Sequence, residues 1–179
     1  MTGKNYTMKN VKVESPISLL ENGCVVIATL MLGLMAGFFW TYSINVSPAL
    51  MSLDGDMYGR VQSLLNQNVR HPMFFVFFFD SAGATAVAAL ANWRHWRTWS
   101  FWLIVISLLV YAGGVVGFTK LVNLPLNYYT ESWLPGSVPG DWEQVRSRWN
   151  SANLFRVGAS ASAFGLCVIA LMIRATVRN

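Results

Sequence analysis

The sequence predicts an all-α protein: a membrane-embedded four-helix bundle with short amphipathic interfacial helices in the loops after spans 1 and 3. Hydrophobic residues make up 54% of the 179 residues and charged residues only 12%, whereas about a quarter of a soluble domain is charged. The charged residues lie mainly between four apolar runs that are long enough to cross a bilayer as helices. The expected spans are residues 24–46, 72–91, 99–122 and 153–174.

The bundle is expected over residues 21–174, between a polar N-terminal tail (1–20) and a basic C-terminal tail (175–179). Residues 1–20 contain no apolar core, so they are not expected to be a signal peptide. The net charge of +5 comes without a basic stripe or an RNA-binding motif, which argues against a nucleic-acid partner. No cysteine or histidine spacing predicts a metal site.

The first span contains a GxxxG motif, Gly33 to Gly37, which allows a neighbouring helix to approach closely. After this span the chain is polar between Met51 and His71. Apolar residues recur there at helical spacing, so a short amphipathic helix is expected to lie on the membrane or on the bundle. These apolar residues are Met57, Val61, Leu64, Leu65 and Val69.

The second span carries an acidic residue, Asp80, directly after an aromatic run. Nine residues into the helix, Asp80 lies near the bilayer centre, where a carboxylate is costly and usually faces the bundle interior. We therefore expect it to pair with a cation. Arg156 is the better partner because its guanidinium is permanently charged and can form two parallel hydrogen bonds, whereas the Lys120 side chain can extend toward the membrane surface. The alternative is that such a pair only maintains the helix register.

The third span ends in a proline segment, and Pro125 is expected to break the helix near Leu124. The freed carbonyls and the carboxamides of Asn123 and Asn127 would then face protein or water. Residues 141–150 form a charged amphipathic stretch that enters the last span.

Antiparallel threading brings most polar residues of the spans to one half of the bundle. This half is expected to hold a polar pocket that is open to lipid-soluble ligands, with aromatic walls that include Tyr128 and Trp149. The residues concerned are Asn45, Asp80, Lys120, Asn123, Asn127 and Arg156. Lys and Arg outside the spans favour the side of the termini by seven to five, so both termini are expected to be cytoplasmic.

The sequence also resembles the DUF1772 or anthrone-oxygenase-like family of small four-helix membrane proteins over residues 25–173. The motifs are Ala36-Gly-Phe-Phe with Pro48, His71-Pro-Met-Phe, Thr119-Lys-Leu-Val-Asn-Leu-Pro-Leu-Asn127, Trp142-Glu, and Trp149-Asn150 followed by Arg156. The resemblance implies a cofactor-independent monooxygenase that converts a polyketide anthrone, or a similar quinol-type aromatic, to the oxidised product.

In this reading the pocket stabilises an enolate-like anion, and molecular oxygen then reacts with that anion. The catalytic residues would be Asp80, Lys120, Asn127 and Arg156. The substrate-binding residues would be Asn45, Asn123, Tyr128, Trp149 and Asn153.

The sequence departs from the family at Asn153, where members often have a histidine three residues before the arginine. Asparagine cannot act as a general base, so His71 or Asp80 would have to take the proton. No cofactor is predicted, although a bound quinone, pigment or lipid fits the same pocket.

The alternative is a non-catalytic accessory or structural subunit of a larger membrane complex, because small-residue helix faces and eight tryptophans are available for contacts. The expected partners are the bilayer and a small aromatic substrate, with partner subunits or a homo-oligomer left open. A transporter is the weakest reading, because neither an internal repeat nor paired broken helices are present.

Overall fold

The computed structural model describes residues 16–176, with side chains from Leu19 onward. It confirms an all-α bundle, and four of its helices are long and apolar enough to cross a membrane. The chain is therefore an integral membrane protein. The four spans are Leu19–Met51, Pro72–Ala91, Trp99–Glu131 and Trp142–Thr176. Residues 1–15 and 177–179 of the two expected tails lie outside the described residues.

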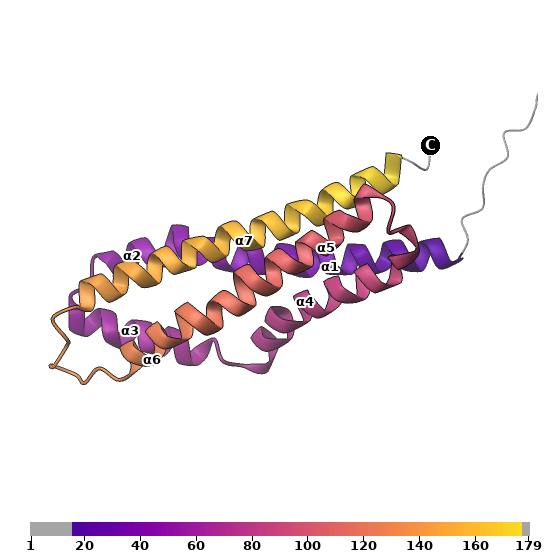
Figure 1. Cartoon of the computed structure of the whole chain (residues 1–179). Coiled ribbons are helices and arrows are strands. Elements are labelled where there is room, and N and C mark those ends of the chain that lie inside the picture. The colour runs from indigo at the N-terminus through magenta and orange to yellow at the C-terminus, as the bar shows by residue number, and fades with distance from the viewer. Residues whose placement is uncertain (1–15, 177–179) are drawn as a thin grey trace, which may run out of the picture.

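The spans run antiparallel, and the start of α1 and the end of α7 lie at one end of the bundle (Figure 1). Helices α1 and α7 pack against each other, α4 packs mainly on α1, and α5 packs mainly on α7. The elements are α1 (Pro16–Thr41), η1 (Tyr42–Val46), α2 (Ser47–Met51), α3 (Gly55–Asn68), α4 (Pro72–Ala91), η2 (Trp93–His95), α5 (Trp99–Tyr111), η3 (Ala112–Gly117), η4 (Thr119–Asn123), α6 (Leu124–Glu131) and α7 (Trp142–Thr176).

Glycines bring these helices close together at two positions. A Cβ at Gly33 would lie 3.0 Å from the Phe164 ring of α7, and a Cβ at Gly114 would lie 2.8 Å from the Ala159 Cβ of α7. A Cβ at Gly37, the second glycine of the GxxxG motif, would meet no atom within 4 Å. The motif therefore serves packing at its first glycine and leaves open space at its second.

The expected helix break at Pro125 is wrong, because the third span continues as helix to Glu131. Two π-helical segments, η3 and η4, precede the proline directly. In a π-turn the backbone is wider and the hydrogen bond runs to the fifth residue. The wider turn relieves the clash between a proline ring and the carbonyl four residues earlier. Pro125 then begins the next α-helical segment as one of its first residues.

The helix expected after the first span is present as α3, and Asp54 caps it by accepting a hydrogen bond from Met57 N at 2.9 Å. The face that α3 turns toward the bundle is partly polar. Gln62 and Asn66 are buried against the bundle, whereas Leu64 is exposed. The second expected interfacial helix, over residues 141–150, is not separate, because these residues are the first turns of α7.

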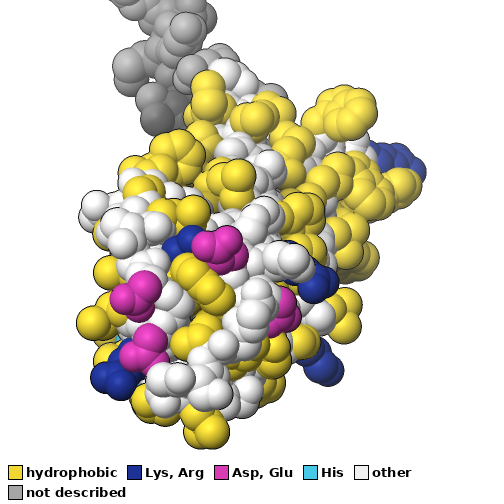
Figure 2. Space-filling model, turned by 90° about the vertical axis from the view of Figure 1, so that its left-hand side faces the viewer, with side chains coloured by type: hydrophobic (Ala, Val, Ile, Leu, Met, Phe, Trp, Pro, Cys, Tyr) yellow, Lys and Arg dark blue, Asp and Glu magenta, His cyan; other side chains and the backbone are white. Residues whose placement is uncertain are grey.

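Ionic contacts hold both ends of the bundle. At the end away from the termini, Arg70 forms a two-pronged ion pair with Glu131 of α6. Figure 2 looks at this end, where acidic and basic side chains gather while the flanks are hydrophobic. Beneath the charges, burial raises the pKa of Tyr58 to about 12, so its phenol stays neutral at physiological pH.

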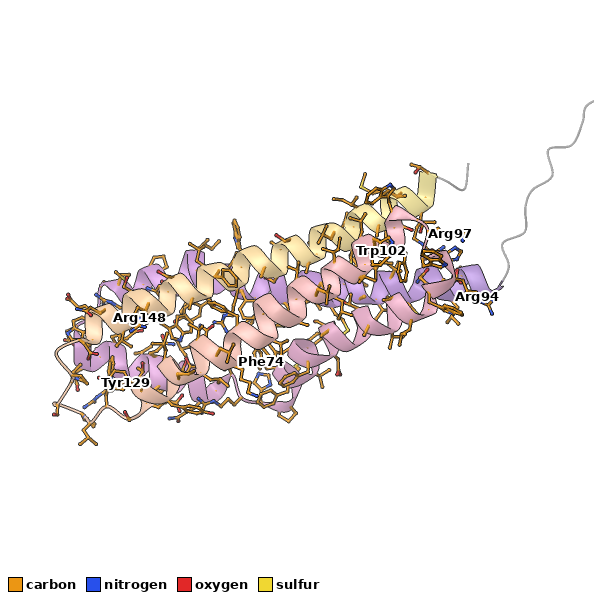
Figure 3. All side chains as sticks on the ribbon, in the orientation of Figure 1. Phe74, Arg94, Arg97, Trp102, Tyr129 and Arg148 are labelled. Carbon is orange, nitrogen blue, oxygen red and sulfur yellow. The ribbon has the colours of Figure 1, made fainter. Side chains whose placement is uncertain are left out.

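At the opposite end, Glu21 of α1 accepts contacts from two elements. His95 Nε2 lies 3.1 Å and Arg174 Nη2 lies 3.8 Å from Glu21 Oε2. Arg94 and Arg97 lie in the same turn as His95, and Figure 3 shows them far from Tyr129 at the other end. These contacts tie α1, the α4–α5 turn and α7 together.

Candidate functional site

A cavity of about 640 Å³ lies in the half of the bundle away from the chain termini. Its walls come from α1, η1, α3, α4, α6 and α7. The first and last spans extend beyond the start of α4, and the cavity lies beside this extension. There α3 takes the place that a longer α4 would fill. Both hydrophobic and polar side chains line it.

We take as the mouth of the cavity the part of its wall where α1 residues are exposed. Leu34 and Phe38 of α1 line it and are exposed on the membrane-facing surface. The Phe38 ring meets the Phe74 ring of α4 with 5.4 Å between centroids. Gly37 contributes no side chain between these two α1 residues. Leu34 and Phe38 belong to the first apolar span, so this exposed part of the wall would face the bilayer.

Arg156 of α7 is the principal charged group of the cavity. Its side chain is only 7% exposed, and no described carboxylate lies within ion-pair distance of it. Nη1 donates to Thr119 Oγ1 at 3.3 Å and Nη2 donates to Asn153 Oδ1 at 2.8 Å, but Nε is buried without a protein acceptor. A buried cation without a counter-ion strongly favours an anionic ligand.

Two aromatic rings lie close to this guanidinium. Its Cζ lies 4.7 Å from the Phe39 ring centroid and 5.6 Å from the Trp149 ring centroid. The Trp149 ring in turn packs on Tyr42, with 4.6 Å between centroids. The ring faces stabilise the positive charge and give the cavity flat walls that suit an aromatic ligand.

Two carboxamides orient the charged and aromatic groups. Asn153 Nδ2 donates to Ser43 Oγ at 2.8 Å and to Phe39 O at 3.3 Å, while its Oδ1 accepts from Arg156. Asn127 Oδ1 accepts from Trp149 Nε1 at 2.6 Å. Asn153 therefore connects α7 to α1 and holds the guanidinium in place, and it has no group that can remove a proton.

Helix α3 supplies a polar wall that the sequence analysis missed. The Tyr42 hydroxyl donates to Gln62 Oε1 at 2.6 Å, and Gln62 Nε2 donates to Asn66 Oδ1 at 3.0 Å. Asn66 lines the cavity, is 3% exposed, and leaves its Nδ2 without a protein acceptor. The four-residue spacing of Gln62 and Asn66 was the available signal, because it puts two carboxamides on one helix face.

Four of the predicted site residues line the cavity, namely Asn127, Trp149, Asn153 and Arg156. Asn123 is fully buried one turn before Asn127 but does not line it. The other four are exposed and outside it, namely Asn45, Asp80, Lys120 and Tyr128.

The expected pairing of Asp80 with Arg156 is wrong. Asp80 lies on the outward face of α4, whereas Phe78 and Ser81 face the core. The expectation used depth alone, and depth does not determine the direction in which a helical residue points. Arg156 is therefore held by polar groups and ring faces, and no carboxylate of residues 16–176 neutralises it.

His71 lies on the cavity wall, and its imidazole is a group that can exchange a proton with a ligand. Its Nδ1 accepts the Phe74 backbone N–H at 3.2 Å, so the ring caps α4. In this state the neutral ring carries its proton on Nε2. His71 can accept a substrate proton at Nδ1 only after the cap hydrogen bond opens.

The donor set of the cavity suits oxygen anions of an organic ligand. No group of three or more His, Cys, Asp or Glu residues that could hold a metal is found within the described part of the chain. Arg156 and the carboxamides of Asn66 and Asn127 instead offer N–H groups to carbonyl or phenolate oxygens. An aromatic with oxygens on its ring system, a quinone included, matches this arrangement.

The family model of the anthrone oxygenases matches residues 73–166, more than half of the chain. The match begins at the second residue of α4, contains all of α5 and α6, and ends within α7, so it includes Asn127, Trp149, Asn153 and Arg156. No curated protein and no solved structure matches the chain. The helical architecture, the four spans and the matched residues agree, and the chain belongs to the anthrone oxygenase family.

Proposed function

We propose that the protein oxygenates a lipid-soluble anthrone or related quinol-type aromatic within this cavity. One observation carries the proposal: Arg156 is buried beside two aromatic rings and has no carboxylate partner among residues 16–176. Such a group stabilises the enolate of a flat aromatic ketone, because it binds the oxygen anion more strongly than the neutral ketone. Membership of the family supports the same chemistry.

The proposed reaction converts a ring CH₂ and O₂ into a ring carbonyl and water. The substrate loses a proton from the CH₂ group, and the resulting charge moves onto the carbonyl oxygen beside Arg156. The carbanion then adds O₂ at carbon, through single-electron transfer and recombination, and gives a peroxide. After the peroxide takes up a proton, a second C–H proton leaves as the O–O bond breaks, which forms the carbonyl and releases water. The substrate supplies all the electrons, so this scheme requires no cofactor.

The residues around Arg156 have positioning roles in this scheme. Asn153 holds the guanidinium, and Asn127 holds the Trp149 ring by accepting from its indole N–H. The unpaired Nδ2 of Asn66 is a donor for a second oxygen of the substrate. His71 takes the proton, assisted by opening of its cap contact to Phe74.

We further propose that both termini are cytoplasmic, so that the cavity lies in the outer half of the membrane. The short turn at the end with the termini carries Arg94 and Arg97, and arginines are enriched in cytoplasmic loops. Labelling of a single cysteine introduced in this turn, from either side of intact cells, tests this orientation.

A bulky residue at Gly37 is expected to block the reaction without disturbing the fold. A Cβ at Gly37 meets no atom within 4 Å, and the residue lines the cavity, so a phenylalanine there occupies substrate space. For Gly37→Phe we expect at least a tenfold loss of O₂ uptake and of anthraquinone absorbance with 1,8-dihydroxyanthrone as the substrate. The assay uses the full chain purified in a mild detergent.

Gly23→Phe is the matched control for this experiment. Gly23 lies on the same helix outside the cavity, and a Cβ there also meets no atom within 4 Å. It should behave as the wild type. If wild-type protein consumes no O₂ above the spontaneous rate, or if both variants keep full activity, the proposed function is wrong. The first result would favour the alternative, a non-catalytic subunit of a membrane complex.

A further inference from the structure

An acidic side chain, Asp80, lies on the outward face of α4 in the middle of the membrane span. It follows Pro72 by eight residues and precedes Ala91 by eleven, which places it about 12 Å and 17 Å from the helix ends at 1.5 Å per residue. It forms no ion pair with any residue of the described chain. Nothing in the bundle therefore compensates this carboxylate.

The residues around Asp80 form a continuous exposed face of α4. Val76, Asp80, Gly83, Val87 and Leu90 are all exposed and follow one another at intervals of four and three residues. This spacing is that of a helix–helix seam. A Cβ at Gly83 would meet no atom within 4 Å, so a second helix can approach there closely. We call these five residues the α4 outer face.

Lipid acyl chains cannot form hydrogen bonds or ion pairs with the Asp80 carboxylate on the α4 outer face. A carboxylate at mid-bilayer is among the costliest side chains in a membrane, and such residues pair with another polar group. The aspartate side chain has only two carbons beyond Cα, so it cannot reach headgroups about 12 Å away along the axis. A hydrogen-bond donor or a cation must therefore be brought to it by another molecule.

Residues 16–176 of a second copy do not bring a cation to that depth. Arg94 and Arg97 lie in the turn at the membrane edge, and Arg156 is buried inside the bundle. Lys120 is exposed but follows Trp99 by 21 residues, about 31 Å along the span, so it lies about 15 Å above Asp80. Two parallel copies leave each Asp80 without a cationic partner.

We propose that the α4 outer face binds a transmembrane helix of a different protein, with a lysine or arginine near the middle of its span. Charge complementarity selects this occupant, because a cation at that depth pairs with the ionised carboxylate of Asp80. Gly83 lets the partner backbone approach, and Val76, Val87 and Leu90 supply apolar contacts on either side. The interaction is separate from the cavity, which Asp80 does not line.

The test uses the full-length protein in liposomes and synthetic leucine-rich transmembrane helices, with binding measured by fluorescence energy transfer. One peptide carries a single lysine at its centre, a second carries leucine there, and a third carries the lysine one turn from its end. We expect the central-lysine peptide to bind about tenfold more tightly than the other two. Asp80→Asn and Gly83→Phe should each remove this advantage.

Two results overturn the proposal: binding of the central-lysine peptide that is unchanged in Asp80→Asn, and an equal affinity for all three peptides. Energy transfer between two labelled copies of this chain that depends on Asp80 also overturns it, because the occupant is then a second copy. Both variants should keep wild-type thermal stability in detergent and wild-type O₂ uptake, which shows that the fold and the cavity are intact.

Discussion

Arg156→Gln is expected to reduce anthrone oxygenation by about 10²-fold, the cost of removing one preorganised group that stabilises a developing anion. Glutamine keeps a hydrogen-bond donor toward Asn153 but loses the positive charge. The enolate is then formed less readily, and the reaction with O₂ slows with it. The measurement is kcat/KM for O₂ uptake, together with the dissociation constant of the substrate from quenching of tryptophan fluorescence.

Two further variants separate the charge from the structural role of Arg156. Arg156→Lys keeps the positive charge but loses the planar guanidinium with its several N–H donors, so it should retain more activity than Arg156→Gln. Arg148→Gln removes an exposed arginine of the same helix, outside the cavity, and should have wild-type activity. If all three variants oxygenate the substrate at the wild-type rate, Arg156 does not stabilise the anion.

Gly114→Leu is expected to destabilise the bundle by about 3 kcal/mol or more, which exceeds most overpacking substitutions because backbone and not only side chains must move. The added Cβ would lie 2.8 Å from the Ala159 Cβ, within the interface of the third span and α7. The helices would have to separate. Unfolding in SDS, followed by tryptophan fluorescence, measures the change.

The neighbouring glycine provides a control for Gly114→Leu. Gly113 is exposed, and a Cβ there meets no atom within 4 Å. Gly113→Leu should therefore have the same unfolding midpoint in SDS as the wild type. Equal unfolding midpoints for the two variants would mean that the close approach at Gly114 does not contribute to stability.

The depth of each polar residue in the membrane could be predicted from the sequence, because it follows from hydropathy and antiparallel threading. This reasoning placed Asn127, Trp149 and Arg156 in one half of the bundle, the resemblance added Asn153, and the structure brings all four to one cavity. It could not predict rotation about the helix axis. A small angular error moves a residue such as Asp80 from the core to the outward face.

Two features of the chain made rotation and helix ends hard to predict. The π-helical segments η3 and η4 change the number of residues per turn, so residues after them point elsewhere than α-helical counting predicts. They also carry the helix past Pro125. For α3, the apolar spacing left open whether the helix lies on the membrane or on the bundle, and it did not predict that Gln62 and Asn66 line the cavity together with Leu65 and Val69.

The unequal lengths of the spans make the protein sensitive to bilayer thickness. Helix α4 has 20 residues and α7 has 35, about 30 Å and 52 Å at 1.5 Å per residue. Because α4 alone matches the hydrocarbon core, the cavity mouth beside Phe74 lies where acyl chains meet headgroups. Longer acyl chains would immerse the mouth in hydrocarbon and shorter ones would bring it to water. We therefore expect the lipid composition of the membrane to influence which molecules reach Arg156.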